Sequence, residues 1–264
     1  MSNVLALGVA RSGLEVRQFL RNGMTLVFSL AYPVMMLVIF GAIFDYDVAP
    51  GVPFTQYFVA GMIATGLLGN SFQTLGIQIA IERDRGVLKR LAGTPMPRAA
   101  YFVGKIIMVL VFGVLEEALL LAIGAGFYGL DLPSSLHAWL TLVWVSLLGL
   151  AACTLCGIAI SSLPRDGKQA APVISPIALV LQFISGVFFV FTQLPGWMQG
   201  VASVFPLRWL AQGLRSVFLP DRLGHLEAGG GWHLGTVAAV LGAWVVAGLL
   251  LCLVTFRWTG RDGG

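Results

Sequence analysis

Long apolar runs separated by shorter polar stretches set the pattern of this chain. Six of the runs have about the length that a helical membrane crossing needs, roughly 20 mostly apolar residues. They lie near residues 24–44, 55–81, 106–128, 138–163, 172–191 and 235–256. The pattern predicts an all-α integral membrane protein with six transmembrane helices. Composition agrees, because 58% of the 264 residues are apolar and only 11% are charged, whereas soluble domains are about a quarter charged.

Lys and Arg residues are concentrated in the segments that would lie on one side of such a protein. Thirteen of the 16 lie in the N-terminal arm, the 82–105 loop, the turn after the fourth run and the C-terminal tail. The other three are Arg208, Arg215 and Arg222. Because cytoplasmic loops carry an excess of Lys and Arg, both termini are predicted to be cytoplasmic. The net charge of +4 is explained by this asymmetry and by anionic lipid, and does not indicate nucleic acid.

Residues 1–23 are predicted to form an amphipathic helix along the inner membrane surface. Leu7 and Leu14 fall broadly on one side of this helix, and Arg11 and Arg17 are placed to reach lipid headgroups. The first apolar run spans a full bilayer and lacks a small-residue cleavage site. It is therefore predicted to remain as a span and not to be removed as a signal peptide.

The 82–105 loop is more elaborate than a simple connection requires. Val87, Leu88 and Leu91 share one helical face, and basic residues occupy the rest, which predicts a short amphipathic helix. Gly93 fits the end of this helix, and Thr94-Pro95 fits the start of the next one. Composition alone is compatible with a basic interfacial helix or with a contact surface for another protein.

The segment at 192–234, before the last run, is apolar but too interrupted to cross a membrane. It is predicted to form two short helices that enter and leave the outer leaflet, with Trp197 and Trp209 at headgroup depth. The residues that mark this hairpin are Pro195, Trp197, Pro206 and Arg215.

Six polar side chains inside the predicted spans are candidates for cavity lining or substrate contact. They are Asn70, Gln73, Glu116, Glu117, Gln182 and Ser185. A charge at mid-bilayer costs about 2.5–3.5 kcal/mol, so each glutamate is predicted to be neutral, paired or facing a polar cavity. A hydrogen-bonded structural carboxyl and a substrate or proton contact both fit the sequence. The other four fit cavity lining or hydrogen bonds between helices. An intramembrane enzyme that uses Glu116 or Glu117 as a base is the alternative from another class.

No recognisable catalytic arrangement occurs in the sequence. There is no Gly-x-x-x-x-Gly-Lys-Ser/Thr phosphate loop, and no nucleophile is placed beside a base. Cys153-x-x-Cys156 lies in an apolar run without a second Cys pair or a nearby His, which predicts core packing and not a metal site. The chain is therefore predicted to bind no cofactor or metal and to take its energy from elsewhere. A membrane scaffold without transport activity is a further alternative.

Three features together resemble the type-2 ABC exporter permeases. They are the six spans, the Glu82-Arg83-x-x-Gly86 helix that leads to Thr94-Pro95, and Leu194-Pro195-Gly196-Trp197 followed by Phe205-Pro206-Leu207 and Arg215. The likeness covers nearly the whole chain and is closest to the bacterial half-size permeases of the drug and antibiotic resistance branch. It implies a single transmembrane permease domain over residues 1–264, located in the bacterial plasma membrane and paired with a second permease copy as a homodimer.

The resemblance also implies how such a protein is powered. In the family, the loop helix is the coupling element that rests on separate cytoplasmic ABC ATPase subunits, which bind ATP and Mg²⁺. The broken segment forms an outer re-entrant hairpin. The chain would then not be an enzyme itself and would export a hydrophobic drug-like or lipid-like molecule, with a lipid-linked glycan or lipid as the alternative cargo. The coupling residues implied are Glu82, Arg83, Asp84, Arg85, Gly86, Val87, Leu88 and Leu91.

Overall fold

The structure, a computed structural model, describes residues 2–44, 46–227 and 229–256. Its elements in chain order are α1 (Ser2–Arg21), α2 (Gly23–Ile43), β1 (Asp47–Ala49), β2 (Val52–Pro53), α3 (Phe54–Leu68), the π-helix η1 (Gly69–Thr74), α4 (Leu75–Asp84), α5 (Val87–Ala92), α6 (Arg98–Tyr128), α7 (Leu136–Ile160), α8 (Ala170–Ile184), the 3₁₀ helix η2 (Phe191–Gln193), α9 (Gly196–Val204), α10 (Pro206–Phe218), the 3₁₀ helix η3 (Asp221–Leu226) and α11 (Leu234–Thr255). Over these residues the only strands form one short antiparallel hairpin. The predicted all-α class is confirmed.

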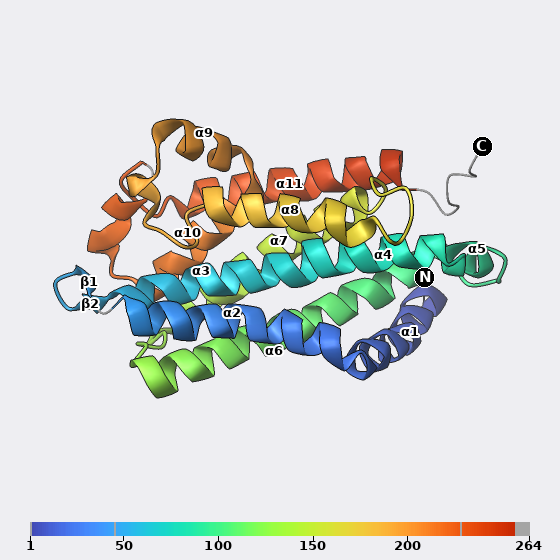
Figure 1. Cartoon of the computed structure of the whole chain (residues 1–264), viewed down its shortest axis with the longest axis horizontal. Coiled ribbons are helices and arrows are strands. Elements are labelled where there is room, and N and C mark those ends of the chain that lie inside the picture. The colour runs from blue at the N-terminus through green and yellow to red at the C-terminus, as the bar shows by residue number, and fades with distance from the viewer. Residues whose placement is uncertain (1, 45, 228, 257–264) are drawn as a thin grey trace.

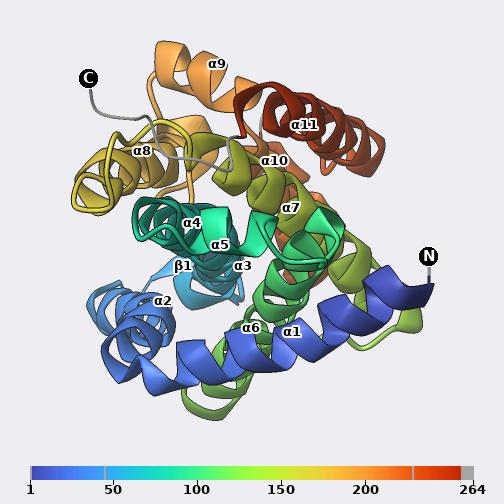
Figure 2. The same ribbon diagram turned by 90° about the vertical axis from the view of Figure 1, so that its right-hand side faces the viewer.

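The long helices lie side by side along one axis of the molecule (Figure 1). Helix α5 and the last turns of α11 lie at one end of this bundle, and the β1–β2 hairpin lies at the other. Helix α1 runs across the bundle near the α5 end and packs over α6 (Figure 2). The segments α3, η1 and α4 follow one another without a break from Phe54 to Asp84, so they form one rod that reaches from the hairpin end to α5.

Four helices of the described chain, α2, α6, α7 and α11, are long and apolar enough to cross a membrane. The rod formed by α3, η1 and α4 has sufficient total length, but the π-helix interrupts its α-helical pattern. Helix α8 has 15 residues, which is about 22 Å and shorter than a hydrocarbon core of about 30 Å. The protein is a multi-pass membrane protein, and the six-span topology stays a prediction.

The distribution of exposed side chains is that of a protein surrounded by lipid. Large apolar residues such as Phe28, Val180 and Val254 are exposed, while charged residues such as Lys105 and Arg215 are fully buried. A hydrocarbon solvent favours this arrangement, because buried polar groups find partners only inside the bundle.

Helix α1 is oriented differently from the prediction. Its inward face is formed by Gly8, Ser12, Glu15 and Phe19, and Leu14 on the outward side is 65% exposed. Arg11 was predicted to reach lipid headgroups, but its guanidinium pairs with the Glu15 carboxylate at 2.9 Å and lies over the Tyr101 ring. Polar partners on α6 therefore determine which side of α1 is buried.

The start of α6 also differs from the prediction. The helix begins at Arg98 after Pro97, and the predicted start at Thr94-Pro95 is wrong. The Thr94 hydroxyl instead donates a hydrogen bond to the carbonyl oxygen of Leu91. Thr94 thus satisfies an acceptor at the end of α5, a role that competes with capping the next helix.

Helix α7 and the π-helix η1 pack backbone to backbone at Gly157. A Cβ atom at this position would lie 2.9 Å from the Cα atom of Phe72 and would also collide with the carbonyl oxygen of Ser71. Small residues permit such close approach between membrane helices. Gly157 therefore determines how closely α7 supports the π-helix.

We expect Gly157→Ala to lower the free energy of unfolding by about 1–3 kcal/mol, the usual cost of overpacking a core, because the obstructing atoms belong to backbone. Gly242→Ala on α11 is the matched control, since no heavy atom lies within 4 Å of its added Cβ. Thermal midpoints of the two detergent-purified variants provide the measurement. Equal midpoints would contradict the close contact.

Candidate functional site

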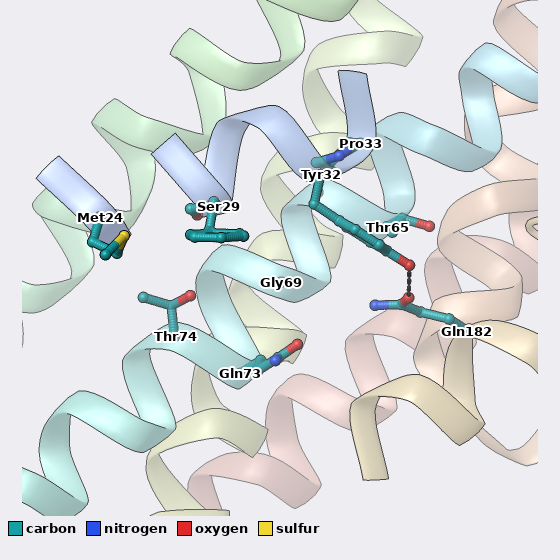
Figure 3. A pocket seen from close by; sticks show the side chains of 11 residues that line it. Met24, Ser29, Tyr32, Pro33, Thr65, Gly69, Gln73, Thr74 and Gln182 are labelled. Carbon is teal, nitrogen blue, oxygen red and sulfur yellow. Dashed lines mark hydrogen bonds between the residues drawn. The ribbon is translucent and has the colours of Figure 1, made fainter. Parts of the chain in front are cut away.

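A cavity of about 420 Å³ lies between α2, the α3–η1 part of the rod and α8 (Figure 3). Its wall combines apolar and neutral polar side chains, and none of the lining residues is charged. The lining residues are Met24, Phe28, Ser29, Tyr32, Pro33, Thr65, Gly66, Gly69, Gln73, Thr74 and Gln182. Such a mixture of apolar surface and a few polar groups is typical of small-molecule sites.

Hydrogen bonds join the helices around this cavity. The Tyr32 hydroxyl of α2 donates to Gln182 Oε1 of α8 at 3.2 Å (Figure 3). Gln73 Nε2 of η1 donates to the Ser175 hydroxyl of α8 at 3.0 Å. A second cavity of about 430 Å³ shares Tyr32, Gln73 and Gln182 and continues along α8 past Pro176. The two cavities together form one groove with a polar strip in its wall.

A further group of polar side chains lies behind the cavity wall. Asn70 of η1 donates from Nδ2 to Glu116 Oε2 of α6 at 3.0 Å, and its Oδ1 accepts a hydrogen bond of 3.1 Å from the Ser29 hydroxyl. Asn70 and Glu116 are both buried, whereas Ser29 lines the cavity. The arrangement connects the cavity to a buried carboxyl through one amide.

The structure separates the predicted span residues into three groups. Gln73 and Gln182 line the cavity, and Asn70 and Glu116 lie directly behind it. Glu117 faces α7, where its carboxylate accepts a hydrogen bond from Ser146, and Ser185 is buried at the end of α8. Neighbouring helical residues point about 100° apart, which explains why the two glutamates have different partners.

Several lining residues were missed in the sequence. Ser29, Tyr32 and Thr65 were not singled out, although each is a polar residue in an apolar run. Ser29 and Tyr32 are three positions apart and therefore share a helical face. That spacing on α2 was the signal that could have identified them.

Helix α5 presents basic side chains at the end of the rod. Lys89 and Arg90 are exposed, whereas Leu88 is buried in the core. Gly86 connects α4 to α5 in a left-handed conformation, with φ of 68°. Glycine adopts this conformation without the steric cost that other residues carry. The exposed surface of α5 is therefore mainly basic, with Val87 and Leu91 half-buried at its edge.

Two of the residues predicted for this surface lie inside the chain. Glu82 and Arg83 are buried in the last turn of α4. The Lys105 ammonium pairs with Glu82 Oε1 at 2.5 Å, and Arg83 donates to the carbonyl oxygen of Ser161 at 2.6 Å. Their interactions anchor the rod to α6 and to the end of α7, so they do not form an exposed contact surface. Asp84 and Arg85, in contrast, are exposed.

Near the other end, α9 and α10 form a helical pair before α11. Pro195 precedes α9, Pro206 occupies the first turn of α10, and Trp197 is exposed. Arg215 of α10 points inward, although it was predicted simply as a marker of the hairpin. Trp209, predicted at headgroup depth, is half-buried and donates its indole N–H to the carbonyl oxygen of Ser203.

Comparison with known proteins shows the following relations. The sequence profile of the family described as ABC-2 type transporter matches residues 13–219. The probable multidrug ABC transporter permease YbhR of Escherichia coli K12 is 23% identical over 197 residues, which cover 74% of this chain and 52% of the relative. The putative transport permease YvfS of Bacillus subtilis 168 is 26% identical over 196 residues, covering 73% and 77%. The inner membrane transport permease YadH of Escherichia coli K12 is 25% identical over 216 residues, covering 78% and 80%. The matched part thus amounts to about half the length of YbhR.

Proposed function

The chain belongs to the ABC-2 type transporter family, and from this membership we propose that it is the permease subunit of an ATP-driven exporter in the bacterial inner membrane. Two permease copies pair around a common path, and both termini of each copy are cytoplasmic. Separate ABC ATPase subunits bind ATP and Mg²⁺ and dock at α5. The cargo is a hydrophobic drug-like or lipid-like molecule that occupies the groove between α2, η1 and α8.

The observation that carries this proposal is the continuity of the rod. Thr65 and Gln73 in its middle line the cavity, and Gly86 at its end connects directly to α5. A displacement of α5 by a motor subunit would tilt the rod and move one wall of the groove relative to α2 and α8. This couples ATP-driven motion to a change in access to the cavity.

A lipid or lipid-linked glycan is the second candidate cargo. A separate cavity of about 340 Å³ lies among η1, α7, α8, α10 and α11, and nearly all of its wall is apolar. Phe72, Cys153, Ile177 and Trp244 are among its lining residues. Such a wall suits an acyl chain better than a polar drug. The family consists of transport permease subunits, so the enzymatic alternative with Glu116 or Glu117 is set aside.

The test of the proposal is co-expression with candidate ATP-binding subunits. We expect a partner to co-purify with the chain, and its ATP hydrolysis to rise when cargo is added to the reconstituted complex. Drug-like and lipid cargoes are compared at the same concentration, which distinguishes the two candidates. Transport of cargo by the purified chain without any nucleotide-hydrolysing partner would overturn the proposal.

Reversing the charge of α5 should uncouple ATP hydrolysis in the motor subunits from cargo binding in the permease. We expect Lys89→Glu with Arg90→Glu to reduce cargo-stimulated hydrolysis by about tenfold or more, because like charges placed opposite each other cost several kcal/mol at an interface. Arg165→Glu with Lys168→Glu, at two exposed basic residues in the α7–α8 connection, is the matched control. ATPase activity and co-purification are measured for both variants. An equal loss in both variants would show that general charge, and not α5, matters.

A further inference from the structure

The carboxyl of Glu116 lies against the cavity wall at a point where the wall has no side chain. Gly66 lines the cavity, and a Cβ atom at Gly66 would lie 2.5 Å from Glu116 Cδ. Glu116 itself is 1% exposed. Gly66 therefore contacts both the groove and the carboxyl, and any larger residue at this position would collide with Glu116.

One oxygen of this carboxyl is without a protein partner. Glu116 Oε2 accepts the hydrogen bond from Asn70, whereas Oε1 has no hydrogen-bond partner among the described residues. A buried acceptor that stays unsatisfied costs stability, because it has lost its hydrogen bonds to water without replacement. The structure thus holds an acceptor beside the cavity that a ligand would satisfy.

No basic side chain neutralises this carboxyl within the described chain. The ion pairs found there involve Glu15, Glu82 and Glu227. The residues that line the cavity include no Lys or Arg. An ionised carboxyl at membrane depth is costly unless a partner is present, so a cationic ligand beside Glu116 would stabilise its ionised form.

The link from Ser29 through Asn70 holds the carboxyl in place. Asn70 belongs to the π-helix η1, a type of segment that occurs frequently at functional sites. Because Ser29 lines the groove and Asn70 contacts Glu116, a ligand that displaces Ser29 from Asn70 also changes the support of the carboxyl. Glu117, one residue away, has no such connection and serves as a comparison.

We propose that the groove binds an organic cation with an apolar body, and that Glu116 binds the positive group of this ligand beside Gly66. The apolar part of the wall, with Met24 and Phe28, contacts the body of the ligand. This binding proposal rests on the proposed function only in assuming that the bound ligand is then exported. Binding itself requires neither a motor subunit nor ATP.

The test uses the purified full chain in lipid nanodiscs with two probes of similar shape. Tetraphenylphosphonium is the cation, and triphenylphosphine oxide is the uncharged comparison. We expect Glu116→Gln to weaken tetraphenylphosphonium binding by about tenfold or more and to leave the affinity for the uncharged probe unchanged. The Glu117→Gln variant should bind tetraphenylphosphonium with the affinity of the wild type. Equal affinity of wild type and Glu116→Gln for the cation, or no cation binding by wild type, would overturn the proposal.

A second measurement needs no variant and therefore does not depend on how a variant folds. Dicyclohexylcarbodiimide reacts with buried carboxyls, and peptide mass spectrometry reports the extent of modification at Glu116. We expect tetraphenylphosphonium to slow this modification and triphenylphosphine oxide to leave it unchanged. Modification that is insensitive to the cation would contradict the proposal. If no cargo, charged or neutral, stimulated ATP hydrolysis by the wild-type chain with its partner subunits, the proposed function would be refuted instead.

Discussion

Lys105→Met is expected to destabilise the protein by about 3–5 kcal/mol, the usual effect of removing one partner from a buried ion pair. The Lys105 ammonium is fully buried and lies 2.7 Å from Glu15 Oε2 and 2.5 Å from Glu82 Oε1. Without it, Glu15 is left with the guanidinium of Arg11, and Glu82 is left with the neutral hydroxyl of Tyr101. Equilibrium unfolding in mixed detergent micelles measures the loss.

The same substitution tests how the α4 end of the rod is attached to α6 and α1. Lys105 joins α6 to α1 through Glu15 and to α4 through Glu82, and the Tyr101 hydroxyl donates to Glu82 Oε2 at 2.8 Å. Adding Glu15→Gln and Glu82→Gln to Lys105→Met should recover part of the stability, because the uncompensated charges are removed. Lys168→Met at an exposed position is the control. A loss no larger than that of the control would show that the cluster contributes little.

Arg215→Met should have a comparable effect at the opposite end of the molecule, again about 3–5 kcal/mol. The guanidinium of Arg215 pairs with Glu227 Oε1 at 2.6 Å, donates to the carbonyl oxygen of Gly186 and lies 4.0 Å from the centre of the Tyr57 ring. Its loss removes the ion-pair partner of the buried Glu227 carboxylate. It also releases the contact of α10 with the segment that follows α8. Unfolding in mixed micelles is again the measurement.

A neighbouring arginine provides the matched control for that experiment. Arg208 of α10 is also buried, but it donates to the neutral side chain of Gln212 at 2.9 Å. Arg208→Met leaves the Gln212 amide oxygen without this hydrogen bond and removes only a longer-range attraction to Glu227, so its cost should be smaller, about 1–3 kcal/mol. A larger loss for Arg208→Met than for Arg215→Met would contradict the importance of the Glu227 pair. Arg215→Lys should be intermediate, because lysine keeps the charge but cannot form the two-pronged contact.

The class of the protein and the approximate places of its helices follow from the sequence alone. Transfer of a side chain from water to hydrocarbon depends mainly on that side chain and its near neighbours, so apolar runs mark the long helices directly. The spacing of Val87, Leu88 and Leu91 likewise placed α5, because helical periodicity is local. The family resemblance drawn from these features is confirmed by the match to the ABC-2 type transporter profile.

Only the tertiary structure decided which polar residues meet. The partners Lys105 and Glu15 are 90 positions apart, and Asn70 and Glu116 are 46 apart, so no local pattern relates them. In the sequence Glu116 and Glu117 are neighbours that no pattern distinguishes. Packing places Glu116 beside the cavity and Glu117 against α7. In a membrane a buried polar group needs a partner within the bundle, and the arrangement of helices in three dimensions determines which partner is within reach. For the same reason Glu82 and Arg83, which the family resemblance implied as coupling residues, lie buried and join α4 to α6 and to the end of α7.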